Sequence, residues 1–278
     1  LFPSTPLFRS ERCWGATRPS TLYLGSGPRL LRYDVVARTF QTVFDVSQRA
    51  DLFGANRQIF QMHSSDDDRV HSATVMDSVT YRRLGCLTYR EETTTFRFFP
   101  ATGTFKECHV DKSGRWLLVF DTAGGTVSNV VIDLQTGQQR TVLDRAPGGI
   151  LGHYDTGYGY VVAYDRWSGH PGTYRLWRFG SEPAAPYAWG PGLETFHSSA
   201  WKYQVPDHVS WGHARPESVT PVHKQYVCGS GATTGAVPWA NEIICWRLDA
   251  SLAVLVVAPV MTDLGAAGGG AKIGRAHV

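Results

Sequence analysis

The sequence predicts an all-β fold, namely a truncated β-propeller of four-stranded blades with about five blades present. Three observations lead to this prediction. A strand–turn–strand pattern recurs along most of the chain, and turn residues are abundant, with 29 glycines and 15 prolines. No segment shows a sustained 3.6-residue apolar period, so few helices are expected. A β-sandwich is the alternative, but the even repeat favours the propeller.

The clearest repeat lies in the middle of the chain. Residues 108–120 combine a strand, a Lys-Ser-Gly turn and a second apolar strand. Residues 129–143 then give a third strand, a hairpin turn that contains Gly137, and a fourth strand. Four strands within about 40 residues match the size of one propeller blade.

The same pattern recurs on both sides of this unit. Pairs of third and fourth strands are expected in three blades, at 31–34 and 40–44, at 87–90 and 96–99, and at 244–249 and 252–255. In one further blade a third strand is expected at 176–179. First and second strands are expected at 153–163 and at 208–211, the latter resuming at 225–228 after an insertion from about Gly212 to Lys224. The chain therefore divides into one partial blade followed by fuller ones.

The domain organisation follows from this repeat and from the two ends. Residues 11–271 are expected to form one incomplete propeller domain. Residues 1–10 and 272–278 resemble translated sequencing adapter, with natural low-complexity termini as the alternative, and we exclude both from fold reasoning. The gene would then extend beyond both ends and could have encoded a signal peptide. A periplasmic or secreted location is favoured, and the oligomeric state is left open.

Composition and charge exclude several function classes. The net charge of +3 comes without a Lys/Arg cluster, so no nucleic-acid partner is expected. No apolar run approaches the roughly 18 residues of a membrane helix, so no membrane span is expected. The five cysteines lack Cys-x-x-Cys spacing. Cys228 and Cys245 could face each other across one hairpin, but we interpret them as small buried core residues.

A histidine falls at the same place in four successive blades. The four residues are His63, His109, His153 and His208, each just before the turn into the second strand. The first strand of every propeller blade lines the central channel, so these side chains are predicted to converge there. Neutral imidazoles suit a divalent metal ion, and manganese, calcium and zinc are not distinguished. The alternative is that the histidines hydrogen-bond neighbouring blades together.

Other residues near the histidines are candidates for supporting roles. Asp111 and Asp155 lie two residues beyond a histidine on the same strand face, so they could orient the rings. Arg166 and Trp167 fall in a loop and would offer a stacking surface and an anion clamp to an acidic sugar. Trp211, at the start of the insertion, is assigned to the same substrate-binding role. Core packing is the alternative for both tryptophans.

The pattern of strand, Ser-Gly-Arg turn, strand and Ile-Asp-Leu-x-Thr-Gly, clearest from Val110 to Gly137, resembles the repeats of TolB-type propellers. The histidine entries also resemble oligogalacturonate lyase propellers. The second resemblance implies a divalent metal held by histidines at the propeller axis. It also implies a base that removes a proton beside a uronate carboxylate, for which Lys112, Arg166 and Arg215 are the candidates.

The resulting functional hypothesis is a propeller with a histidine-lined metal site that binds or eliminatively cleaves acidic oligosaccharide. If it is an enzyme, it would be a metal-dependent polysaccharide lyase. The alternative hypothesis is a non-catalytic propeller that serves as a protein-interaction scaffold, with no bound metal.

Overall fold

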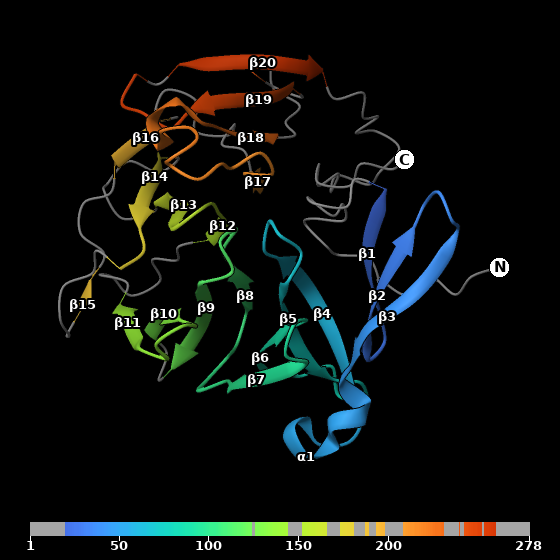
Figure 1. Cartoon of the computed structure of the whole chain (residues 1–278). Helices are drawn as coiled ribbons and strands as arrows, with labels where there is room; N and C mark the ends of the chain where they lie inside the picture. Colours follow the sequence, from blue (N-terminus) through green and yellow to red (C-terminus); the bar gives the residue numbers. More distant parts are fainter. Residues whose placement is uncertain are drawn as a thin grey trace, which may run out of the picture. The chain divides into compact units, whose positions relative to one another are not determined.

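The structure is a computed structural model that describes residues 20–123, 126–143, 152–165, 173–180, 187–188, 193–197, 208–230, 239, 242–251 and 253–259. Its strands form five antiparallel sheets, and the predicted all-β propeller is confirmed (Figure 1). The helical elements are short, as expected: η1 (Val46–Arg49), α1 (Ala50–Phe53) and η2 (Val222–Lys224). The chain divides into two compact units, residues 1–143 with 185–187, and residues 144–184 with 188–278.

Unit 1 contains sheets 1, 2 and 3. Sheet 1 has three strands, β1 (Thr21–Ser26), β2 (Arg29–Asp34) and β3 (Thr39–Asp45). Sheet 2 has four, β4 (Arg57–Ser64), β5 (Val70–Asp77), β6 (Arg83–Arg90) and β7 (Thr95–Pro100). Sheet 3 comprises β8 (Glu107–Val110), β9 (Trp116–Ala123), β10 (Thr126–Asp133) and β11 (Gln139–Leu143), with the short β15 (Tyr187–Ala188) beside β11.

Unit 2 contains sheets 4 and 5. Sheet 4 is formed by β12 (Gly152–Thr156), β13 (Tyr160–Asp165), β14 (Thr173–Arg178) and β16 (Leu193–His197). Sheet 5 is formed by β17 (His208–Ser210), β18 (Tyr226–Ser230), β19 (Glu242–Arg247) and β20 (Val254–Pro259). The insertion predicted between the first two strands of the last blade is present between β17 and β18. The expected order of one partial blade followed by fuller ones is therefore confirmed.

Aspartates at the ends of strands explain why the turns recur so regularly. The carboxylate of each accepts hydrogen bonds from backbone N–H groups a few residues further on, which closes the turn. The residues that do this in the β2–β3, β5–β6, β8–β9, β10–β11 and β19–β20 turns are Asp34, Asp77, Asp111, Asp133 and Asp249. Because the same residue type closes successive hairpins, the repeat can be recognised in the sequence.

The hydrophobic core is divided among the spaces between neighbouring sheets. Sheets 1 and 2 enclose one cluster that includes Tyr23, Phe44 and Met62. Sheets 2 and 3 enclose a second cluster around Val70 and Leu117, and sheets 4 and 5 enclose a third in unit 2. Sheet 2 therefore contributes alternate side chains to a core cluster on each of its two faces.

Two disulfides correct the interpretation of the cysteines as unpaired core residues. Cys228 and Cys245 are direct register partners on β18 and β19, with Cα atoms 4.0 Å apart, and they are bonded. Cys86 on β6 is bonded to Cys108 on β8, which joins sheet 2 to sheet 3. The second pairing was not expected, because its partners lie on different blades and come together only when the sheets pack.

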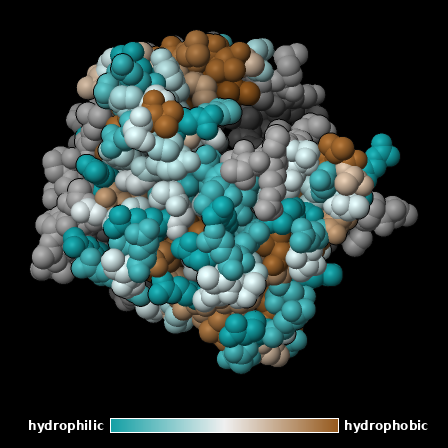
Figure 2. All heavy atoms as spheres, viewed as in Figure 1, coloured by the Kyte–Doolittle hydropathy of each residue, from teal (hydrophilic) through white to brown (hydrophobic). Residues whose placement is uncertain are grey.

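The outer strand of sheet 5 exposes apolar side chains. Leu255, Val256 and Val257 on β20 are about half exposed, at 56%, 46% and 55%, and hydrophobic atoms gather over β19 and β20 (Figure 2). Within the described part of the chain, no helix has the length and apolarity needed to cross a membrane.

Candidate functional site

The four predicted histidines all lie on the first strand of a sheet. His63 is on β4, His109 on β8, His153 on β12 and His208 on β17. The backbone positions expected from the repeat are therefore observed. The side chains of His153 and His208 lie outside the described residues, so only the pair in unit 1 has a described geometry. Convergence of all four remains a prediction.

The structure brings His63 and His109 together. Their rings stack with centroids 3.4 Å apart and an interplanar angle of 23°. Both side chains are buried, at 6% and 1% exposure. Burial, followed by the nearby His109 and Lys112, lowers the pKa of His63 well below its ordinary value. His63 is therefore uncharged near neutral pH and keeps a nitrogen lone pair for a ligand. The stack also joins sheet 2 to sheet 3.

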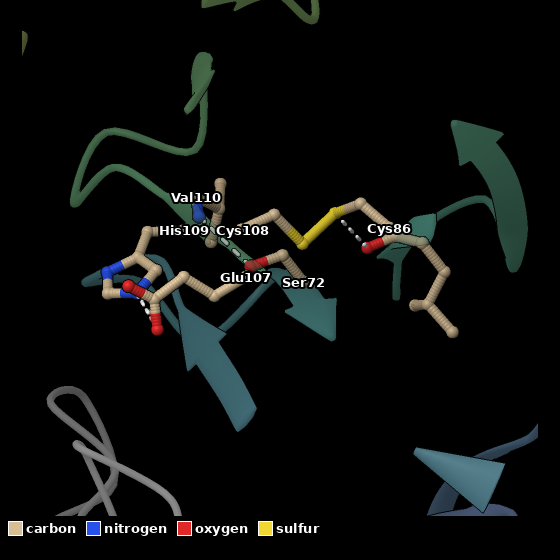
Figure 3. Close-up of a disulfide and its surroundings, with 7 residues drawn as sticks. Ser72, Cys86, Glu107, Cys108, His109 and Val110 are labelled. Atoms are coloured by element: carbon tan, nitrogen blue, oxygen red, sulfur yellow. Dashed lines mark hydrogen bonds and ion pairs between the residues drawn. A yellow bond between two sulfur atoms is a disulfide. The ribbon is translucent and has the colours of Figure 1, made fainter. Parts of the chain in front are cut away.

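Two polar residues that the sequence reasoning missed accompany the pair. Glu107 lies two positions before His109 on β8, and its Oε2 is 3.9 Å from Nε2 of His109 (Figure 3). Gln61 lies two positions before His63 on β4, and its Nε2 donates a 2.9 Å hydrogen bond to the same Glu107 oxygen. The available signal was the polar–apolar–His spacing that Glu107-Cys108-His109 shares with Gln61-Met62-His63.

Gln61 occupies a β-bulge. The register of β4 against β5 passes from Phe60 to Met62 and leaves Gln61 as the extra residue, with a left-handed φ of 47°. A non-glycine residue in this conformation is strained, and such strain is concentrated at functional sites. The Oε1 atom of Gln61 is buried and has no hydrogen-bond partner among the residues that the structure describes. The bulge therefore holds an amide group beside the histidine pair at a cost in backbone energy.

Residues proposed to support the histidines have defined positions. Lys112 is buried and its charge acts on His63, so it belongs to this site. Asp111 accepts hydrogen bonds from the backbone N–H groups of Arg115 and Trp116, which assigns it to the β8–β9 turn. In unit 2, Asp155 accepts a 2.6 Å hydrogen bond from the backbone N–H of Trp211.

The predicted substrate-binding residues are not gathered into one described site. Trp211 is 1% exposed and packs in the core of unit 2, so its placement does not support a role in stacking on a sugar. Arg215 is exposed, and its backbone N–H and carbonyl bond to the Gln225 side chain. Arg166 and Trp167 lie outside the described residues, and their predicted roles stay predictions.

A second buried polar cluster connects sheet 1 with sheet 2. His71 on β5 has Nδ1 2.8 Å from Ser64 Oγ and Nε2 2.8 Å from Glu91 Oε1. Glu91 also accepts a hydrogen bond from Arg32 of β2. Burial alone would raise the pKa of Glu91, but the hydrogen bonds from His71 and Arg32 lower it to about 2. The ionised carboxylate thus holds the two sheets together.

We expect Glu91→Gln to lower the free energy of unfolding at pH 7 by about 1–2 kcal/mol. The full depression of the Glu91 pKa would correspond to a larger loss of stability. The Glu91 side chain is 21% exposed, however, so water screens its ion pair with Arg32. Because the folded pKa is depressed, this stabilisation is present above about pH 4.5 and is lost as the pH falls towards 2. Urea unfolding across this pH range should therefore show that the difference in free energy of unfolding between wild type and Glu91→Gln shrinks as the pH falls.

Glu92→Gln is the matched control for this prediction. Glu92 pairs with Arg69 on the surface, where both side chains are about half exposed, so its loss should cost under about 0.5 kcal/mol. Equal losses for the two variants would contradict a special role for Glu91.

The donor types at the histidine pair suit a divalent metal ion only in part. Two imidazoles and a carboxylate are ordinary ligands for such an ion. Among the residues whose placement is described, however, no group of three or more histidine, cysteine or acidic side chains is close enough to hold a metal. His63 and His109 can therefore supply two ligands, and a complete site needs further donors.

Comparisons with known proteins confirm the fold. No protein-family model and no curated protein sequence matches this chain. An oligogalacturonate lyase from Vibrio parahaemolyticus is similar over 90% of this chain and 65% of its own, with 7% identity and a TM-score of 0.56. An oligogalacturonate lyase in complex with manganese is similar over 88% of this chain and 63% of its own, with 10% identity and a TM-score of 0.54.

TolB from Acinetobacter baumannii is similar over 92% of this chain and 55% of its own, with 11% identity and a TM-score of 0.50. This chain thus spans less than two thirds of each of these three proteins. At these identities the likeness establishes a shared β-propeller architecture, as the sequence resemblance predicts, and nothing about activity.

Proposed function

We propose that this protein is a β-propeller that binds acidic oligosaccharide with a divalent metal ion held by histidines of the first strands. The observation that carries the proposal is the stack of His63 on His109. Two buried imidazoles from successive sheets lie in contact, and burial keeps His63 uncharged. Neutral imidazoles are donors of the type that a borderline metal ion prefers, and the two rings would rotate out of the stack to direct both lone pairs at one ion. The metal-binding roles of His153 and His208 stay predictions from the sequence repeat.

The likeness to oligogalacturonate lyases, one of them in complex with manganese, supports the ligand class. A bound divalent ion would offset the charge of a uronate carboxylate and make the neighbouring C–H bond more acidic. Lys112 in its unprotonated form is the preferred base for that proton, because it is the candidate that is buried near His63. In an elimination, the glycosidic C–O bond would then break as a C=C bond forms, and the departing oxygen would take up a proton from water.

The two disulfides support the proposed location. Disulfides persist in oxidising compartments and are rare in the bacterial cytosol. Cross-links at Cys86–Cys108 and Cys228–Cys245 therefore favour a periplasmic or secreted protein.

Metal titration of the full chain tests the proposal directly. We expect isothermal titration of the metal-stripped protein with Mn²⁺ to show about one equivalent bound, and the His63→Ala/His109→Ala variant to bind at least tenfold more weakly. The matched control is His213→Ala/His223→Ala, which removes two exposed histidines and should bind as wild type does. Circular dichroism melts establish that each variant is folded.

The scaffold hypothesis has one observation in its favour, the exposed apolar side chains of β20. It predicts that the folded wild-type protein binds no divalent metal. Absence of Mn²⁺ binding by folded protein, or equal binding by both double variants, would reject the metal proposal and leave the scaffold as the better candidate.

A further inference from the structure

Strand β8 has two chemically different faces. It comprises only four residues, Glu107–Val110, at the edge of sheet 3. Because side chains alternate along a strand, Cys108 and Val110 point into the core that sheet 3 shares with sheet 2, whereas Glu107 and His109 lie on the opposite face of β8. There they meet Gln61 and His63 of the strand β4. Figure 3 shows Cys108 extending to Cys86 on one side, with His109 and Glu107 together on the other. The disulfide and the candidate site thus occupy opposite faces of one short strand.

Among the contacts between β8 and sheet 2, two lie directly on either side of His109 in the sequence. Cys108 is covalently bonded to Cys86 of β6. The backbone N–H of Val110 donates a 3.0 Å hydrogen bond to Ser72 Oγ of β5. Cys86, Cys108 and Ser72 are fully buried, so both contacts lie in the packed space between the sheets. Both neighbours of His109 in the sequence, Cys108 and Val110, are therefore held against sheet 2.

The same two contacts also restrain the distance from His109 to His63. Ser72, which accepts the bond from Val110, is the register partner of His63 in the pairing of β4 with β5. The strand that carries His109 is thus fastened to the residue directly opposite His63. A shift of β8 along or away from sheet 2 would separate the two rings, whose centroids are 3.4 Å apart.

We infer that the Cys86–Cys108 disulfide is a positioning clamp for the histidine pair, so that the His63–His109 stack depends on the cross-link. For its effect on metal affinity the inference rests on the proposed function, but the geometry of the stack can be measured without any ligand. Residues that orient metal ligands typically change affinity by about 10–100-fold, which sets the expected effect of breaking the clamp.

Histidine NMR spectra of the full chain provide the ligand-free test. The protein contains ten histidines, and His63→Ala and His109→Ala variants assign the two signals of interest. Each stacked ring shields the protons of the other, so both sets of ring protons should be shifted upfield in the oxidised protein. In Cys86→Val/Cys108→Val, which keeps apolar side chains at both positions, we expect these upfield shifts to be lost.

The second disulfide gives a matched control. Cys228→Val/Cys245→Val removes a cross-link of similar sequence separation from unit 2 and should leave the His63 and His109 signals unchanged. Unchanged signals in the Cys86/Cys108 variant would overturn the inference, and so would equal changes in both cysteine variants. Loss of the stack only in the Cys86/Cys108 variant supports the clamp, even if the wild type binds no Mn²⁺ and the proposed function fails.

Ser72→Ala keeps the test decisive if the cysteine variant does not fold. This substitution removes the hydrogen bond to Val110 and leaves the disulfide in place. A folded Ser72→Ala protein should show a partial movement of the His109 signals towards their unstacked positions. Complete loss of the stack in a folded Ser72→Ala protein that keeps its disulfide would overturn the clamp, because the cross-link would then not hold the two rings together.

Discussion

Replacing Gly85 with alanine is expected to lower the free energy of unfolding by about 4 kcal/mol. Gly85 lies on β6 opposite Pro100 of β7 and has a φ of +148°. A Cβ atom there would lie 2.2 Å from the carbonyl oxygen of Phe99 and 2.9 Å from Cα of Pro100. Both are backbone atoms held in the β6–β7 pairing, so the clash cannot be relieved by rotating a side chain.

Gly27→Ala separates this clash from the cost of the backbone conformation. Gly27 also has a positive φ, +57°, but no atom lies within 4 Å of the position of its added Cβ. Its replacement should therefore cost only about 1 kcal/mol. Urea unfolding of the two variants followed by tryptophan fluorescence measures both values. Similar losses for Gly85 and Gly27 would show that contact with β7 is not the cause.

Replacing Gly157 with alanine is expected to destabilise unit 2 by about 3 kcal/mol. The added Cβ would lie 2.6 Å from Cζ3 of Trp211 and 2.8 Å from two further indole carbons. The indole cannot move away easily, because it is 1% exposed and the backbone N–H of Trp211 is bonded to Asp155. Thermal unfolding monitored by circular dichroism should show the loss.

A double-mutant cycle identifies the ring as the cause. Trp211→Phe removes the half of the indole that the new Cβ would meet, so Gly157→Ala should cost at least 1 kcal/mol less in that background, about the size expected for contacting residues. Gly212→Ala is the control, since the nearest atom to its added Cβ is Ser210 Oγ at 3.6 Å. Additive effects at Gly157 and Trp211 would argue against the proposed contact.

The strands were predictable because their determinants are local. A hairpin such as β10–β11 requires alternating apolar residues and an aspartate that caps the turn, and Asp133 supplies that cap within three residues. The first-strand positions of His63 and His109 followed from the same repeat, because equivalent residues occupy equivalent places in successive sheets. Their stacking follows once sheet 2 packs on sheet 3.

Features that depend on packing between sheets could not be predicted. Cys86 and Cys108 are 22 residues apart, and nothing in their spacing indicates that β6 meets β8. Trp211 was assigned to a sugar-binding mouth because loops between strands are usually exposed, yet the close approach of Gly157 lets the indole enter the core. Glu107 was overlooked because a single acidic residue next to a cysteine carries no signal without its partner Gln61.

The extra residue at Gln61 decides on which face of β4 each later side chain lies. Ile59 and Met62 enter the same core although they are three positions apart, and the bulge reconciles that spacing with a two-residue alternation. In a regular strand of the same length, without the bulge, the two faces beyond Gln61 would be exchanged relative to Ile59. His63 would then turn into the apolar core, and Met62 would take the place beside His109. The bulge at Gln61 therefore decides which face of β4 carries His63.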